Sequence, residues 1–350
     1  MVYFIGWGLM YLALLASEIS GHRSRIPLVV VITAAAIMAV LRGSVGTDTS
    51  TYEWMLDSVT LGDLSHGVEP SFVLLGWFFK LATDSSTGAV RLLSLVFFVL
   101  LFVFVMRANK NERFYLLACF LPAFVYQYSM NALRLGLASI CLLLAFQWIR
   151  QSNLVSRLLW VGVALTFHYS SIFVVGYLLL QKLRWFSLKN LSIFALFALA
   201  VGGVVLVNIQ YFLMKLDAYS DAVSPGSFSG MSKVILIGVM LVAVVQSSMA
   251  REAKFKLLSL TIPMVVIFFG LATLSYAGLR FLDLLAFAVP LVVLLIFNES
   301  GKEFDWRIKA GMVLFGLLSV VASSRNYFAE ATLGPSPFLP YHVLDALQVY

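Results

Sequence analysis

Apolar blocks long enough to cross a membrane follow one another along the chain, with short polar segments between them. A helix of about 20 apolar residues, within a range of about 17–25, crosses a bilayer. Spans are predicted near residues 2–17, 25–41, 88–106, 114–129, 132–149, 191–208, 233–249, 257–274, 279–297 and 309–323. The pattern therefore predicts an all-α polytopic membrane protein with about 10–12 transmembrane helices. We expect residues 1–350 to form a single transmembrane helical domain.

Two further apolar segments do not fit a simple span. Residues 69–82 open with Glu69 and Pro70 and then carry only a short apolar run. Residues 158–180 are interrupted by a polar run that starts at His168. Non-helical backbone at membrane depth is tolerated where it lines a cavity. We therefore expect a partial helix after Glu69 and a broken, re-entrant hairpin at His168.

Short basic loops indicate which ends of the spans share a side of the membrane. Lys and Arg gather in the loops 22–25, 107–113, 150–157, 182–189, 251–256 and 302–309. Such loops favour the cytoplasmic side. All six can lie there together only if 69–82 does not cross and 158–180 enters and returns. The outer side then carries 42–68, 129–134, 168–171, 209–232, 275–280 and the tail 324–350.

Composition excludes several classes of protein. The chain is 61% hydrophobic and 12% charged, whereas soluble domains are about 45–50% apolar and about 25% charged. The net charge of +7 is explained by orienting loops, so no nucleic-acid partner is predicted. No Walker or Rossmann glycine loop and no metal-ligand spacing of histidines is present, so neither a cofactor nor a metal is expected. Cys119 and Cys141 are predicted to be packing residues.

A few ionisable residues interrupt or border the apolar blocks, and they carry the functional signal. Each costs roughly 2.5–3.5 kcal/mol or more at membrane depth, so such residues usually mark a site. In the predicted topology Asp48, Glu69, Arg134, His168 and Arg280 all face the outer side. We therefore expect them to converge on one outward-facing vestibule.

Asp48 lies in a polar segment, between Arg42 and Tyr52, that contains two glycines and several hydroxyl side chains. A carboxylate in this setting can act as a general base on a sugar hydroxyl. Asp48 is equally suited to cap the helix that follows it. Tyr52 is a candidate for stacking on a sugar, although aromatic belts at membrane interfaces also explain such residues.

The two arginines suggest a clamp for a phosphate or pyrophosphate, because the planar guanidinium matches phosphate oxygens. Arg280 has an alternative in an ion pair with Asp283 one turn later. Arg134 has an alternative in reaching out to the membrane interface. His168 can donate to a phosphate or position the base, or can be a hydrogen-bonded structural residue.

Two remaining candidates also allow two interpretations. Glu69 can contact substrate or cap the helix that follows it. Arg42, at the end of an apolar block, is a candidate for substrate binding or an anchor at the membrane interface.

The order of these motifs resembles the EpsG-like family of exopolysaccharide and O-antigen polymerases, which are Wzy-type proteins. The resemblance is carried by these motifs in order: Arg42 with Val45-Gly46-Thr47-Asp48 and Tyr52, Glu69-Pro70, Asn131 with Arg134 and Ala138, Phe167-His168-Tyr169-Ser170-Ser171, and Leu279-Arg280-Phe281. The chain departs from the family pattern in carrying Leu135 after Arg134, where glutamine is common, and Gly278-Leu279 before Arg280, where an acidic residue is common.

The resemblance implies an activity and a location. Such polymerases sit in the bacterial inner membrane with a periplasmic active site and a GT-C-like architecture. They transfer a growing glycan from undecaprenyl pyrophosphate to the non-reducing end of a lipid-linked repeat unit, without a nucleotide sugar. A polysaccharide co-polymerase that regulates chain length is an implied partner.

On this basis we expect defined roles for the candidate residues. Arg134 and Arg280, aided by His168, stabilise the departing pyrophosphate, and Asp48 takes the acceptor proton. Arg42, Tyr52 and Glu69 shape the loop or hold sugar. Two alternatives remain open, namely an O-antigen ligase that uses the same lipid-linked donor, and a transporter or flippase for lipid-linked oligosaccharides.

Overall fold

A computed structural model describes residues 2–21, 24–58, 69–147, 153–182, 228–328 and 338–343, together with the single positions 203, 206, 209 and 213. These residues form helices and no strand, and an isolated bridge joins Arg42 to Val343. The predicted span 191–208, most of the predicted outer segment 209–232 and much of the tail lie outside the described residues.

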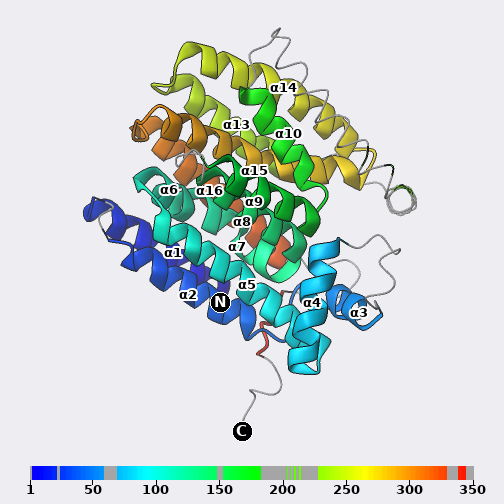
Figure 1. Ribbon diagram of the computed structural model, residues 1–350. Coiled ribbons are helices and arrows are strands. Elements are labelled where there is room, and N and C mark those ends of the chain that lie inside the picture. The colour runs from blue at the N-terminus through cyan, green and yellow to red at the C-terminus, as the bar shows by residue number, and fades with distance from the viewer. Residues whose placement is uncertain are drawn as a thin grey trace.

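The helices pack side by side in one bundle, with α3 and α4 together at one end (Figure 1). Their bounds are α1 Val2–Ile19, α2 Ile26–Val40, α3 Thr49–Ser58, α4 Pro70–Thr83, α5 Ser86–Arg107, α6 Lys110–Tyr115, η2 Leu116–Phe120, α7 Leu121–Tyr126, η3 Gln127–Asn131, α8 Leu133–Gln147, α9 Leu154–Phe167, α10 Ser171–Lys182, α13 Met231–Gln246, α14 Arg251–Ala272, α15 Tyr276–Glu299 and α16 Trp306–Phe328.

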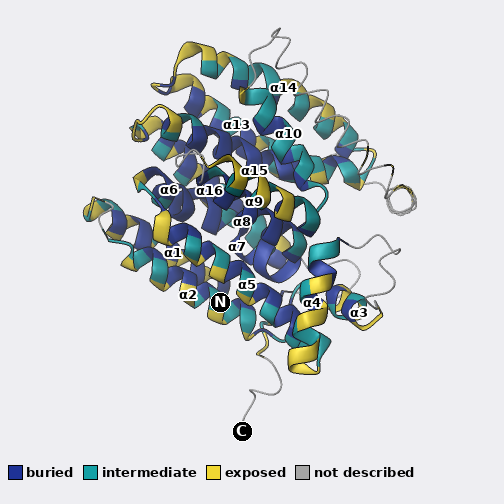
Figure 2. Ribbon diagram, in the orientation of Figure 1, coloured by how far each residue is buried: buried dark blue, intermediate teal, exposed yellow. Residues whose placement is uncertain are grey.

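The helices confirm an all-α polytopic membrane protein. Among the described residues, α1, α5, α14, α15 and α16 are long and apolar enough to cross a membrane, and shorter apolar helices lie between them. The lipid-facing character is plain on α14, where Val266 is 66% exposed and Ile267 is 62% exposed. Exposed residues lie along the outer helices of the bundle, and buried residues fill its centre (Figure 2). Such a surface suits lipid rather than water.

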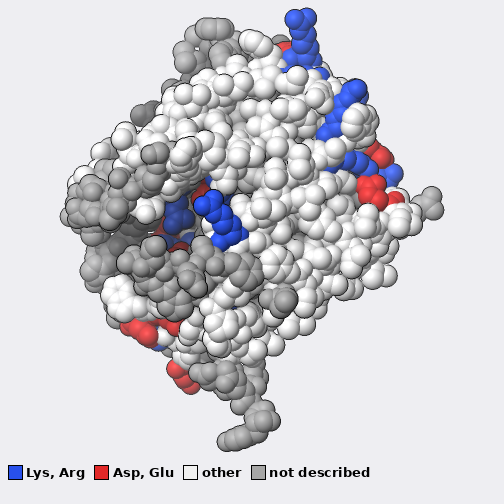
Figure 3. Space-filling model, turned by 180° about the vertical axis from the view of Figure 1, so that it is seen from behind, with Lys and Arg blue, Asp and Glu red and all other residues white. Residues whose placement is uncertain are grey.

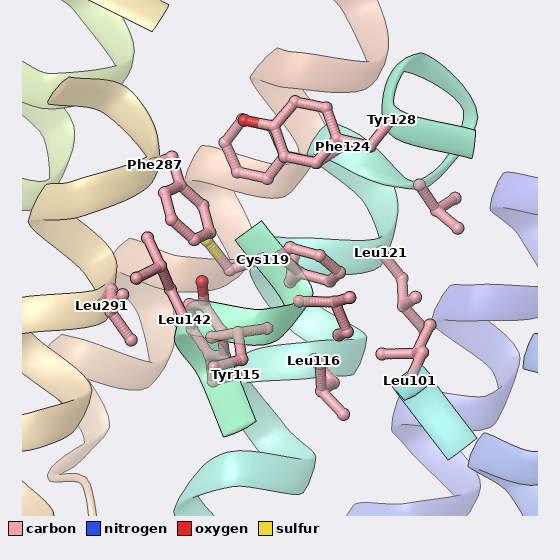
Figure 4. Close-up of a cluster of buried hydrophobic side chains, with 14 of the residues drawn as sticks. Leu101, Tyr115, Leu116, Cys119, Leu121, Phe124, Tyr128, Leu142, Phe287 and Leu291 are labelled. Atoms are coloured by element: carbon pink, nitrogen blue, oxygen red, sulfur yellow. The ribbon is translucent and has the colours of Figure 1, made fainter. Parts of the chain in front are cut away.

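The centre of the bundle is built from the segment 110–131 together with α8 and α15. Leu116, Leu142 and Leu291 from these helices meet in one buried cluster (Figure 4). Cys119 and Cys141 are buried in the core and carry no disulfide, which confirms the prediction that they are packing residues. This rigid centre fixes the ends of its helices, and the candidate site is built on those ends.

The predicted span at 114–129 is longer and less regular than expected. It runs from Lys110 to Asn131 and widens twice into π-helical turns, η2 and η3. Pro122 has no N–H to donate to the carbonyl of Ala118, four residues earlier. Gly316 of α16 packs against that oxygen so closely that an added Cβ would lie 2.1 Å from it. The proline thus accounts for one irregular turn, and the glycine lets a neighbouring helix cover it.

The chain reverses abruptly between η3 and α8. Only Ala132 separates the two helices. Gly136 then lies against η3, where a Cβ would approach the carbonyl oxygen of Tyr128 to 2.3 Å. Glycine is therefore required at this position for the reversal, which sets Arg134 at the start of α8.

A Gly136→Ala substitution is expected to destabilise the protein strongly, because the added methyl group meets rigid backbone rather than a movable side chain. Overpacking of this kind typically costs about 1–3 kcal/mol or more. A thermal melt in detergent measures the effect. Gly238→Ala on α13 is the matched control, since nothing lies within 4 Å of its added Cβ. Equal melting temperatures for the two variants would contradict the packing argument.

The structure confirms the predicted break at His168. Helix α9 ends at Phe167 and α10 begins at Ser171. The two have 14 and 12 residues, or about 21 and 18 Å, which is well short of the hydrocarbon core of about 30 Å. Helix α4 begins at Pro70 as predicted and has 14 residues, so it is also a partial helix by length.

The helix ends that adjoin the six basic loops are joined to one another by polar contacts. These helix ends therefore lie at the same end of the bundle. Ion pairs join Lys309 to Glu18 and Lys110 to Glu303 at 2.8 Å each, and Lys182 to Glu299 at 2.5 Å. Further connections there include Gln147 to Glu112 and Ser248 to Asp305. Figure 3 shows charged side chains along one edge of the molecule and around a hollow on the opposite part, with uncharged surface between.

Candidate functional site

A pocket of about 160 Å³ opens at the end of the bundle opposite the basic loops. Most of the residues singled out from the sequence line it, although they come from widely separated segments. The ionisable and hydroxyl-bearing lining residues are Asp48, Tyr52, Arg134, His168, Ser170, Arg280 and Asp283. Convergence of these side chains in one place is what the predicted topology required.

The backbone that carries Asp48 is held closely against the end of η3. Gly46 has φ +105°, and a Cβ there would lie 2.7 Å from the carbonyl oxygen of Met130. The backbone N–H of Asp48 donates to Oδ1 of Asn131 at 3.0 Å, and the hydroxyl of Thr47 reaches the same oxygen. Helix α3 starts at the next residue. Asn131 therefore places Asp48 at the rim of the pocket.

Glu69 forms a buried cluster with Arg134 and His168. Its side chain is 0% exposed, and its Oε2 accepts a hydrogen bond from Nη1 of Arg134. Its Oε1 lies 2.8 Å from Nδ1 of His168. Glu69 occupies the N-cap position of α4 but makes no side-chain cap bond. The carboxylate thus lies behind the pocket wall and holds two wall residues in place.

Arg134 is fixed from several sides. Beyond its bond to Glu69, its guanidinium lies 5.5 Å from the ring centre of Tyr52 and 5.9 Å from that of Phe72. Its side chain remains 16% exposed and lines the pocket. The arginine is therefore anchored inside the protein rather than extended to the membrane interface. A guanidinium has five N–H donors and can contact more than one acceptor at a time.

Tyr52 is a largely buried residue in the wall of the pocket. It is 2% exposed, and its ring lies 5.2 Å from that of Phe72. Burial raises the pKa of Tyr52 to about 12, so the phenol keeps its proton at neutral pH. It is therefore no candidate for the general base.

Arg42 lies behind the pocket and is buried. It is 0% exposed and is not among the residues that line the pocket. Its guanidinium donates to the carbonyl of Ala39, to the hydroxyl of Ser94 at 3.0 Å and to the carbonyl of Met130 at 3.3 Å. A buried guanidinium engaged in this way supports the backbone behind the site. These contacts favour a structural role for Arg42, and its predicted contact with substrate stays a prediction.

Arg91 shares this role and was not singled out from the sequence. Its side chain donates to the backbone carbonyls of Arg42 at 2.8 Å and Gly43 at 2.7 Å. It also lies 3.4 Å from Glu53 of α3. The signal was present, since Arg91 is a charged residue inside the apolar block at 88–106.

Arg280 lies near the start of α15. The hydroxyl of Ser275 caps this helix by accepting from the N–H of Ala277. Gly278 allows the turn to pack on α14, since a Cβ would lie 2.2 Å from the backbone nitrogen of Ala272. Asp283, one turn on, makes an ion pair with Lys233 of α13 at 2.7 Å. Sequence spacing suggested only Arg280 as its partner.

The pocket contains the groups needed to bind an anion and to accept a proton. Two arginines and a histidine face it together with two carboxylates, Asp48 and Asp283. Within the described ranges, no group of three or more His, Cys, Asp or Glu side chains could hold a metal ion. The fold and pocket together define a polytopic membrane protein with a polar site at one end of an apolar bundle.

The sequence model of the EpsG family matches residues 25–343, and the chain therefore belongs to this family. No curated protein and no solved structure matches the chain. Family membership fits a role of the polysaccharide-polymerase type. The matched range includes the residues of the pocket.

Proposed function

We propose that the protein polymerises polysaccharide by moving a growing glycan from undecaprenyl pyrophosphate to the non-reducing end of a lipid-linked repeat unit. The observation that carries the proposal is the gathering of Asp48, Arg134, His168 and Arg280 in one pocket of a membrane-spanning bundle. Cations suit the pyrophosphate, a carboxylate suits the acceptor hydroxyl, and the apolar outer surface suits a polyprenyl tail.

The proposed step is a substitution at the anomeric carbon of the donor glycan. The acceptor oxygen forms a bond to this carbon, and the bond from the carbon to the pyrophosphate oxygen breaks. The leaving oxygen takes the bonding electron pair, so negative charge grows on the pyrophosphate. Asp48 takes the proton that the acceptor hydroxyl loses. No nucleotide or other co-reactant is needed.

Arg134 and Arg280 stabilise the charge on the departing pyrophosphate, and His168 assists them. Preorganised donors aimed at developing charge are usually the largest single contribution to catalysis. Glu69 holds Arg134 and His168 and thus acts as a positioning residue. Tyr52 packs against Arg134, and Arg42 supports the backbone that carries Asp48.

The proposed orientation follows from charge. The basic loops belong to one end of the bundle and the pocket to the other. If the basic end is cytoplasmic, the pocket of a protein in the bacterial inner membrane faces the periplasm. Undecaprenyl-linked units meet it there, and a co-polymerase partner would act on the same side. The GT-C-like architecture remains a prediction.

Purified protein in lipid nanodiscs is expected to convert lipid-linked repeat units into a ladder of longer glycans. The repeat units are extracted from cells of the source organism in which this protein has been deleted. Release of undecaprenyl pyrophosphate is measured together with the glycan ladder. Chain growth without another enzyme supports the proposal. Transfer that occurs only when lipid A–core is added would identify a ligase. Movement of lipid-linked units across the membrane without new bonds would identify a transporter.

A further inference from the structure

A second cavity, of about 390 Å³, adjoins the pocket and differs from it in chemistry. Four residues line both spaces, among them Arg280 and Asp283. The second cavity is the larger one, and its volume falls in the range of about 300–1,000 Å³ that is typical of small-molecule sites. It lies between η3, the end of α16 and the tail segment at Phe338. The proposed function does not account for it.

The walls of this cavity carry carboxamides. Gln127, Asn131 and Asn326 line it, and they come from η3 and α16. Oδ1 of Asn131 is occupied by Thr47 and Asp48, while its Nδ2 makes no hydrogen bond within the part of the chain that the structure describes. Across the same residues, no hydrogen bond involves the side-chain amides of Gln127 or Asn326. The cavity therefore holds hydrogen-bonding groups that are ready for a ligand.

Aromatic rings form another part of the wall. Phe124, Tyr327 and Phe338 line the cavity. The ring of Phe338 stacks on that of Tyr327 with ring centres 4.3 Å apart. The ring of Tyr327 also stacks on that of Trp7, with ring centres 5.8 Å apart. The phenol of Tyr3 donates to the backbone carbonyl of Phe338 at 3.3 Å. These contacts fix the aromatic wall, so the ligand meets a preformed surface.

Carboxamides and aromatic rings together match a sugar better than a phosphate. A sugar hydroxyl both donates and accepts, as a carboxamide does, whereas phosphate oxygens at neutral pH mainly accept and favour cations. The C–H faces of a sugar ring are apolar and pack on aromatic side chains. Arg280 lines both spaces, whereas Arg134 and His168 line only the smaller pocket. The ammonium of Lys233, which also lines the second cavity, is paired with Asp283 at 2.7 Å.

We propose that the second cavity is a glycan subsite, in which Gln127, Asn131 and Asn326 bind sugar hydroxyls next to the aromatic wall. This inference rests on the proposed function and divides the substrate site into two parts. The pyrophosphate lies in the cationic pocket, and the sugar units next to it occupy the carboxamide cavity. Arg280, which lines both, sits where the two parts of a lipid-linked oligosaccharide join.

A binding experiment with two ligands tests the division. Purified protein in nanodiscs is titrated with sugar-free undecaprenyl pyrophosphate and with the lipid-linked oligosaccharide extracted from source cells that lack the protein. A Gln127→Ala/Asn326→Ala variant is expected to bind the sugar-bearing lipid about tenfold more weakly or worse, because several hydrogen bonds are lost. Its affinity for the sugar-free lipid should remain unchanged. An Asn326→Trp variant, which fills the cavity, should show the same selectivity.

Gln246→Ala is the matched control, since this exposed amide lies at the end of α13 away from the cavity. Unchanged binding of both lipids by the double variant would overturn the subsite, and so would equal weakening of both. If the unaltered protein binds neither lipid, the proposed function fails and the subsite fails with it. If it binds both and the variants do not discriminate, only the subsite is overturned.

Discussion

An Arg134→Ala variant is expected to lose at least about 10²–10³ of the polymerisation rate, the usual effect of removing one preorganised donor to a developing anion. The variant should also be less stable. Glu69 is fully buried, and without the guanidinium its charge loses a close cationic partner. Breaking a buried pair from one side typically costs about 3–5 kcal/mol. Rate is measured on the glycan ladder, and stability by thermal unfolding in detergent.

A Glu69→Gln/Arg134→Met variant separates the two effects. It removes both charges and keeps similar side-chain volumes, and replacement of a whole buried pair is often neutral for stability. The glutamine oxygen can still accept from Nδ1 of His168, which lies 2.8 Å from Glu69 Oε1. We expect a melting temperature near that of the unaltered protein with activity still lost. Recovery of the glycan ladder in this variant would show that Arg134 serves only the fold.

The long helices followed from the sequence because their apolar runs are continuous. The predicted span 88–106 became α5, Ser86–Arg107, and 279–297 became α15, Tyr276–Glu299. The segment 110–131 was harder, since π-helical turns depend on contacts with neighbouring helices that a local pattern does not contain. The apolar pattern thus predicts where a span lies. Contacts with neighbouring helices decide whether the span is a regular α-helix.

The candidate site shows the same division between local pattern and distant contact. Rarity of charge in apolar blocks was enough to single out Asp48, Arg134, His168 and Arg280, which line one pocket. The partner of Arg134 was not predictable, because Glu69 lies 65 residues away in the chain. Arg42 was judged by its place at the end of an apolar block, yet acceptors from three separate segments surround it. The spacing of residues near Arg42 in the sequence cannot predict acceptors that come from distant segments.

An Asp48→Asn variant is expected to fold normally and to lose about 10²–10⁴ of the polymerisation rate, which is the typical contribution of a positioned general base. Asparagine keeps the shape of the side chain, and the backbone N–H that donates to Asn131 is unaffected. The glycan ladder formed from lipid-linked repeat units measures the rate. Asp57→Asn is the control, because Asp57 lies on the neighbouring helix α3 in an exposed pair with Lys80, and solvent and salt screen such pairs strongly.

The choice of Asp48 over the other carboxylates is itself open to test. Glu69 is fully buried and engaged with Arg134 and His168, so it is a poor acceptor for a substrate proton. Asp283 lines the pocket, but its carboxylate is already engaged in an ion pair with the Lys233 ammonium at 2.7 Å. Asp48 lies at the pocket rim without an ion pair of this kind among the described residues. A normal ladder from Asp48→Asn together with none from Asp283→Asn would transfer the role of base to Asp283.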